Sequence, residues 1–264
     1  MEIAANTSIE EKSENPERKF TAFNINNRYA LLFTGVFITV LILWNGVCDY
    51  IYGYSASLSG LDYFSPAALD VIQNANGRPH WLVLLGQTAG WLYPFYALTY
   101  FNWFAGMRRA GIWLAHIPIA LLAYAVLMIG GIQHAGWAFL SVLEQARAVT
   151  GSEDPVFFAQ AQRFILEHFL MGDLTALIAL YAGTLWHAVG VLSGRTWFPR
   201  WFVIFSPLGA LSLTMAFGIA LPAPLAGFVL APFGTWFLLI PNIASALWLR
   251  KRLLSAKDPD ARKV

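Results

Sequence analysis

Cysteine is almost absent from this chain, which has Cys48 alone among 264 residues. A single cysteine cannot form an internal disulfide, so a disulfide-stabilised scaffold is excluded. Cysteine-rich zinc sites are excluded for the same reason, and we expect no metal site.

Charge is also scarce, since Asp, Glu, Lys and Arg make up 12% of the residues, against about 25% in soluble domains. Hydrophobic residues make up 58% of the chain. The shortage of charge is concentrated in long uncharged runs, which are typical of membrane spans. The net charge of +2 comes without a basic surface pattern, so we expect no nucleic-acid partner.

Several catalytic motifs are missing. The chain has no HExxH zinc motif, no GxSG nucleophile motif, no histidine box of membrane di-iron oxygenases and no DDxxD motif. An enzyme of this sequence would therefore not ionise a diphosphate with a metal. Protonation-initiated chemistry without a cofactor remains as the enzymatic interpretation.

What the sequence does contain is six apolar segments, each long enough for the roughly 20 residues of a membrane-crossing helix. We therefore predict an all-α fold, a polytopic transmembrane helix bundle with six spans within residues 30–250. The predicted spans are Ala30–Tyr52, Trp81–Phe104, Ile112–Gly131, Phe164–Leu192, Phe202–Leu221 and Leu225–Leu249. Residues 1–29 form a predicted polar tail and residues 251–264 a basic tail.

The distribution of basic residues predicts the orientation. With both termini in the cytoplasm, the tails and the cytoplasmic loops hold 14 of the 17 Lys and Arg residues, as the positive-inside rule expects. The outer loops are then 53–80 and 146–163. We expect helix, acidic turn and helix within 140–163, with the third span continuing as helix toward Ala148.

Ionisable side chains gather near the outer ends of the first four predicted spans. An ionisable residue inside a span is costly and marks a candidate functional site. The candidate catalytic residues are Asp173, Glu167, His134 and Asp49. Asp173 is the deepest acid. Glu167 and His168 are adjacent, and Glu167 and Asp173 lie about 120° apart around a helix, so at most two of these three residues can point into one pocket.

Other polar and aromatic residues at similar depth complete a predicted outer-leaflet pocket. They are Gln133, His80, His168, Asn45, Trp137 and, after a helix-kinking proline, Asn242. Asn45 is one turn before Asp49 on the same helix face. The glycines around His134, in GGIQHAGWAF, allow a neighbouring backbone or ligand to approach.

These residues favour a membrane-embedded enzyme that uses carboxylate and histidine groups for general acid–base chemistry. The expected substrate is lipophilic, of isoprenoid or sterol type, and the expected reaction is isomerisation, cyclisation or hydration. Aromatic side chains would stabilise cationic intermediates. The expected partners are the lipid bilayer and a lipophilic small molecule, and homo-oligomer formation stays open.

Three alternatives remain. A b-type haem protein would use His134 with His168, and His116 with His187, because these pairs match in depth on two spans. A proton- or ion-coupled transporter would use the outer acids. An accessory subunit of a membrane complex would use the small-residue face at Gly86 and Gly90.

Three segments resemble a family of uncharacterised bacterial six-span membrane proteins, over about residues 30–250. They are GGIQHAGWAF, RTWFPRWFVIFSPL with its Pro199-Arg200-Trp201 turn, and LIPNIASALW with Pro241-Asn242. The resemblance implies the six-span fold and a location in the bacterial inner membrane. It implies no activity.

Overall fold

The computed structural model describes residues 16–65, 79–96, 98–150 and 155–255. These residues are helical apart from short connections, and no strand occurs among them. The α-helices are α1 (Pro16–Gly53), α3 (His80–Tyr96), α4 (Thr99–Met107), α5 (Ile117–Met128), α6 (His134–Thr150), α7 (Pro155–Leu192), α8 (Pro207–Ala220), α9 (Leu225–Leu230) and α10 (Phe233–Ser255). Short 3₁₀ segments are η1 (Asp62–Phe64), η2 (Arg108–Ala110) and η5 (Arg200–Phe205), and π-helical turns are η3 (Ile112–His116) and η4 (Ile129–Gln133).

Three helical segments are long and apolar enough to cross a membrane. They are Ala30–Gly53, Ile112–Arg147 and Leu174–Leu192, which overlap the first, third and fourth predicted spans. The prediction of an all-helical membrane protein is therefore confirmed at this level. Residues 16–29, predicted as part of the polar tail, are helical and form the first part of α1.

The other three predicted spans each consist of two helical pieces. The second is divided between α3 and α4, close to Pro94, which lacks a backbone N–H. The fifth changes from η5 to α8 at Ser206, whose side chain caps α8 before Pro207. The sixth is divided between α9 and α10, next to Pro232. Prolines and a helix cap thus divide apolar segments that hydropathy alone predicts as single spans.

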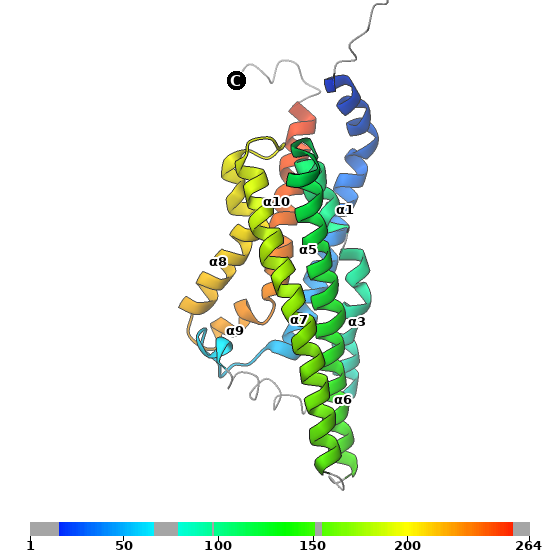
Figure 1. The fold of residues 1–264 in the computed structure, drawn as a ribbon, viewed down its shortest axis with the longest axis vertical. Coiled ribbons are helices and arrows are strands. Elements are labelled where there is room, and N and C mark those ends of the chain that lie inside the picture. The colour runs from blue at the N-terminus through cyan, green and yellow to red at the C-terminus, as the bar shows by residue number, and fades with distance from the viewer. Residues whose placement is uncertain (1–15, 66–78, 97, 151–154, 256–264) are drawn as a thin grey trace, which may run out of the picture.

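Figure 1 shows an elongated bundle in which α1 and α10 run together and α5 lies along α7. The start of α1 and the end of α10 lie at the same end of the bundle. At the opposite end α6 and α7 project beyond the other helices as a hairpin. Helix is present on both sides of the predicted acidic turn, since α6 ends at Thr150 and α7 begins at Pro155. The turn itself, 151–154, lies outside the described residues, as do 1–15, 66–78 and 256–264 of the predicted tails and outer loop.

The helix between Ile112 and Thr150 is continuous but is widened twice into π-helical turns. The first turn precedes Pro118, which has no N–H to donate and whose ring crowds the carbonyl four residues earlier. The N–H of Ile117 accordingly bonds to the carbonyl of Ile112, five residues before it. The second turn, η4, ends directly before His134.

A polar network joins three helices inside the bundle. Asn242 is fully buried in α10 and donates to the Gly35 carbonyl at 3.2 Å and to Thr39 at 3.3 Å in α1. Its side-chain oxygen accepts from Asn102 of α4 at 3.4 Å. Asn242 was predicted to line the outer pocket. Its contacts instead join α10 to α1 and α4, because it packs against Gly35 and Thr39, which lie earlier in α1 than Asp49.

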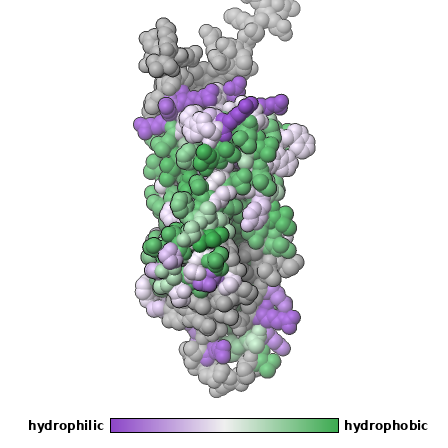
Figure 2. Space-filling model, turned by 90° about the vertical axis from the view of Figure 1, so that its left-hand side faces the viewer, coloured by the Kyte–Doolittle hydropathy of each residue, from purple (hydrophilic) through white to green (hydrophobic). Residues whose placement is uncertain are grey.

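The surface is divided between apolar and basic regions. Figure 2 shows a hydrophobic surface over the bundle and a hydrophilic band at the end where α1 begins and α10 ends. We call this the basic end, defined by residues of η2, the loop after α7 and the end of α10. Its members are Arg108, Arg109, Arg195, Arg200, Arg250, Lys251 and Arg252.

Candidate functional site

A carboxylate and an imidazole meet inside the bundle, away from the basic end. Nε2 of His134 lies 3.2 Å from Oδ1 of Asp49, and the two side chains are 4% and 16% exposed. Asp49 belongs to the last turns of α1, and His134 is the first residue of α6. Two residues that sequence analysis singled out separately are therefore direct partners.

The second oxygen of Asp49 is also bound. It accepts hydrogen bonds from Asn45 Nδ2 at 2.8 Å and from Thr235 Oγ1 at 3.2 Å. Asn45 Nδ2 also lies 3.1 Å from Thr235 Oγ1. The carboxylate is thus fixed by side chains of α1, α6 and α10, which satisfies a buried group that would otherwise be costly.

Two tyrosine rings enclose the imidazole. The ring of Tyr52 lies edge-on at 5.8 Å from the ring of His134, and the ring of Tyr93 lies at 5.4 Å. The Tyr52 hydroxyl donates to the Val83 carbonyl at 2.7 Å, so this ring is itself fixed. His134 is 3% exposed within this enclosure.

Glycines make this enclosure sterically feasible. A Cβ on Gly130 would overlap the Tyr93 ring, and one on Gly86 would lie 2.6 Å from the Tyr52 ring. A Cβ on Gly90 would lie 3.3 Å from the Cβ of His134. The small-residue face at Gly86 and Gly90 is therefore packed against Tyr52 and His134 of the same chain. It does not provide the external surface that the accessory-subunit alternative assumed.

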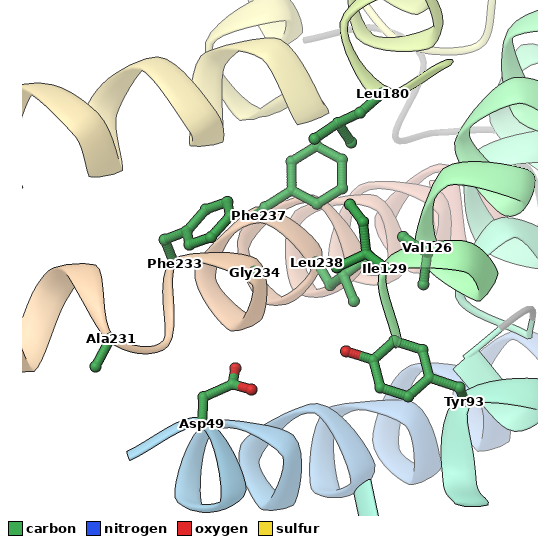
Figure 3. Close-up of a pocket in the computed structure, with 10 residues that line it drawn as sticks. All are labelled: Asp49, Tyr93, Val126, Ile129, Leu180, Ala231, Phe233, Gly234, Phe237 and Leu238. Carbon is green, nitrogen blue, oxygen red and sulfur yellow. The ribbon is translucent and has the colours of Figure 1, made fainter. Parts of the chain in front are cut away.

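A cavity of about 60 Å³ adjoins this pair. Figure 3 shows the Asp49 carboxylate and the Tyr93 hydroxyl directed toward the same space, with apolar side chains around them. The other lining residues are Val126, Ile129, Leu180, Ala231, Phe233, Gly234, Phe237 and Leu238. Asp49 therefore lines the cavity, whereas His134 contacts Asp49 without being among the lining residues.

The pair can hold one proton between two heavy atoms. Oδ1 of Asp49 and Nε2 of His134 are both satisfied by that proton, whichever atom carries it. Nδ1 of His134 has no hydrogen-bond partner among the described residues. Asp49 and His134 can therefore share one proton, and the carboxylate is oriented toward a largely apolar space. This arrangement is suited to proton transfer.

Glu167 and His168 lie elsewhere, contrary to the prediction of a shared pocket. Both are exposed. Glu167 accepts from Arg163 Nε at 2.7 Å, one turn earlier, and the His168 ring stacks on Phe164 at 6.3 Å. The prediction placed them at the start of a span, whereas α7 begins at Pro155 and carries them on the projecting hairpin.

Four further candidates occupy described helices, but their side chains lie outside the described part of the structure. They are Asp173 in α7, Gln133 in η4, His80 at the first position of α3 and Trp137 in α6. Their predicted roles stay predictions.

The histidines proposed as haem ligands have unlike surroundings. His134 faces Asp49, whereas His168 is exposed on the hairpin. His116 is exposed beside the Phe104 ring at 4.8 Å, and His187 is 2% exposed beside the Trp103 ring at 6.0 Å. The cavity at Asp49 is lined by no histidine. His134 and His168 are therefore not placed as partners by the described geometry, and the pairing of His116 with His187 stays a prediction.

Two residues of the site, Thr235 and Tyr93, were not predicted from the sequence. Neither carries a charge, and each lies in a predicted span remote in sequence from Asp49. The signals were weak but present, since Thr235 follows the glycine of APFGTW and Tyr93 precedes the helix-interrupting Pro94.

Comparisons with known proteins give no match: no family model, no curated protein and no solved structure resembles this chain significantly. The indication of function therefore comes from the site itself.

Proposed function

We propose that this protein is a membrane-embedded enzyme that transfers a proton to and from a lipophilic substrate, with Asp49 as the acid–base group. The observation that carries the proposal is the Asp49 carboxylate, which faces an otherwise largely apolar cavity and is fixed by His134, Asn45 and Thr235. A positioned acid–base group typically contributes about 10²–10⁴-fold to a rate.

The simplest reaction is movement of a carbon–carbon double bond. Protonated Asp49 would donate its proton to one alkene carbon, leaving a carbocation on the other. The carboxylate would then remove a proton from the carbon next to the cation, which forms the shifted double bond and restores protonated Asp49. The rings of Tyr93, Phe233 and Phe237 border the cavity and would stabilise the cation.

His134 acts through Asp49 as a positioning residue. Its Nε2 contacts Oδ1 while Asn45 and Thr235 bind Oδ2, and together these contacts set the orientation of the carboxyl group at the cavity. A cavity of about 60 Å³ is small beside typical ligand sites of about 300–1,000 Å³. The cavity would therefore hold only the reacting end of an isoprenoid or sterol, with the rest of the molecule in the lipid.

The proposal includes the membrane topology. We infer six crossings with both termini in the cytoplasm of a bacterium and the protein in its inner membrane. The start of α1 and the end of α10 lie at one end, which supports an even number of crossings. Basic residues gather at that same end, as the positive-inside rule expects for the cytoplasmic side. Asp49, far along α1, then belongs to the outer leaflet.

One observation favours a second candidate, a proton-coupled transporter. The cavity has room for water or a small ion, and a buried carboxylate–histidine pair is a typical proton-relay element in transporters. Deuterium exchange into the substrate distinguishes the two functions, because a transporter does not form carbon–hydrogen bonds.

Such an exchange experiment tests the enzymatic proposal even while the substrate is unidentified. The full chain in lipid nanodiscs is incubated in D₂O with bacterial isoprenoid and neutral lipid extract, and the lipids are analysed by mass spectrometry. Wild type should place carbon-bound deuterium in one lipid class, and Asp49→Asn should reduce this at least about 100-fold.

Glu167→Gln is the matched control, since it removes one carboxylate from the exposed hairpin and should leave exchange unchanged. Equal deuterium incorporation by wild type and a folded Asp49→Asn variant would refute the proposed role of Asp49. Absence of any incorporation, together with Asp49-dependent proton uptake into vesicles, would establish the transporter instead.

A further inference from the structure

Two arginine side chains converge on one indole ring at the basic end. The guanidinium carbon of Arg252 lies 3.9 Å from the ring centroid of Trp197, and that of Arg109 lies 4.9 Å from it. Arg109 belongs to η2 and Arg252 to the last turns of α10. Segments far apart in sequence therefore bring two positive charges to the same aromatic surface.

The backbone of Trp197 is fixed by three hydrogen bonds. Its N–H donates to the Gly106 carbonyl at 2.8 Å. Its carbonyl accepts from Trp248 Nε1 at 2.9 Å and from Arg252 Nη1 at 2.8 Å. The adjacent Phe198 ring occupies the space that a side chain on Gly106 would need. The site is thus built on a frame that joins α4, α10 and the loop after α7.

The two positive charges oppose each other. Partial burial and the nearby charge of Arg109 both lower the pKa of Arg252 from its usual range, although arginine stays charged at neutral pH. Neither guanidinium forms an ion pair with a carboxylate of the described chain. Attraction to the indole face offsets part of this repulsion but supplies no negative charge. A bound anion would supply it.

The position of the site indicates which anion. Figure 2 shows the hydrophilic band of the basic end bordering the hydrophobic surface of the bundle. The rings of Trp201 and Trp248 contact each other at 5.4 Å in the same region, and tryptophan favours the level of lipid headgroups. A phospholipid phosphate lies at that level, whereas a soluble anion has no reason to prefer it.

We propose that Arg109 and Arg252, held together by Trp197, form a binding site for the phosphate of an anionic phospholipid. Arginine binds phosphate oxygens with two parallel N–H donors, and two arginines on one indole present such donors from two directions. The site is separate from the Asp49 cavity and independent of the proposed reaction.

Lipid retention measures this binding. The full chain is released from nanodiscs of mixed phosphatidylglycerol and phosphatidylcholine, and the bound lipids are counted by native mass spectrometry. Wild type should retain phosphatidylglycerol in preference to phosphatidylcholine. Arg109→Gln should reduce that preference about fivefold, which corresponds to the roughly 1 kcal/mol expected for one arginine near an anionic surface.

Arg163→Gln is the matched control, because it removes the same charge from the opposite end and should leave the preference unchanged. Arg109→Lys keeps the charge and should retain part of the preference. Unchanged preference in folded Arg109→Gln would overturn the proposal. Displacement of phosphatidylglycerol by inorganic phosphate would overturn the assignment to a lipid and identify a soluble-anion site.

Discussion

Gly130 lies against the ring of Tyr93, so closely that a Cβ at residue 130 would overlap that ring. The contact joins η4 to α3 beside His134 and sets the position of one wall of the Asp49 cavity. This part of the site can therefore assemble only because residue 130 carries a hydrogen atom where other residues carry a Cβ.

Replacement of Gly130 by alanine should therefore destabilise the protein. Overpacking of this kind typically costs about 1–3 kcal/mol, and the clash is with a ring that is buried in the core. Thermal or denaturant unfolding in detergent measures the loss. The adjacent Gly131 is exposed with nothing within 4 Å of a Cβ, so Gly131→Ala should be neutral or stabilising by about 0.5–1 kcal/mol. Equal effects of the two substitutions would contradict this packing.

Asp49 and His134 should be energetically coupled. Removal of one partner from a buried pair costs about 3–5 kcal/mol, because the other group is left uncompensated. Asp49→Ala and His134→Ala should each destabilise by this amount, and the double variant by clearly less than the sum. A double-mutant cycle with equilibrium unfolding measures the coupling. The exposed pair Arg163 and Glu167 is the control and should show at most about 0.5 kcal/mol. Additive effects at Asp49 and His134 would show that their contact contributes nothing.

Asp62, in the loop after α1, should titrate below the usual range. Hydrogen bonds from the hydroxyl and the backbone N–H of Ser59 lower the pKa of this exposed carboxyl. Because the folded pKa is lowered, the stabilising contribution is present above the unfolded value and is lost as pH falls through the folded pKa. Ser59→Ala should raise the pKa of Asp62 toward its ordinary value, as measured by ¹³C carboxyl shifts. Ser65→Ala is the control, since Ser65 binds the Asp62 carbonyl and not the carboxylate. A Ser59→Ala variant with an unshifted titration would rule out this cause.

His187 should tolerate an apolar replacement. It is 2% exposed, and neither ring nitrogen has a hydrogen-bond partner among the described residues. Burial of unpaired polar atoms is costly, so His187→Leu should leave stability unchanged or raise it by about 1–3 kcal/mol. Asn242→Leu is the contrasting variant and should destabilise, because the Asn102 side-chain N–H loses its acceptor in Asn242 and the Gly35 carbonyl loses one of its donors. A strong loss of stability in His187→Leu, accompanied by loss of a Soret absorption band, would restore the haem alternative.

The helical membrane character was predictable because it depends on composition within single segments. For Asp49 and His134 the sequence predicted only a similar depth in the membrane on different helices, and not their direct contact. Thr235 was not predictable, because its role depends on α10 packing beside α1, and no local pattern encodes that pairing. Glu167 and His168 were assigned to the pocket because hydropathy gives the apolar part of α7 but not how far the helix continues beyond it.

The π-helical turn at Ile129–Gln133 has a consequence for single-residue deletions in this helix. A π turn holds one residue more than an α-helical turn, so it is equivalent to a single inserted codon. Deletion of one residue within it would restore an ordinary α-helical turn and leave the residues beyond in nearly the same orientation, because the wider π turn accommodates that extra residue. The contact of His134 with Asp49 should therefore survive a deletion in η4. Deletion of one residue from a regular turn of α5 would instead rotate η4 and α6 by about 100° and separate the two side chains.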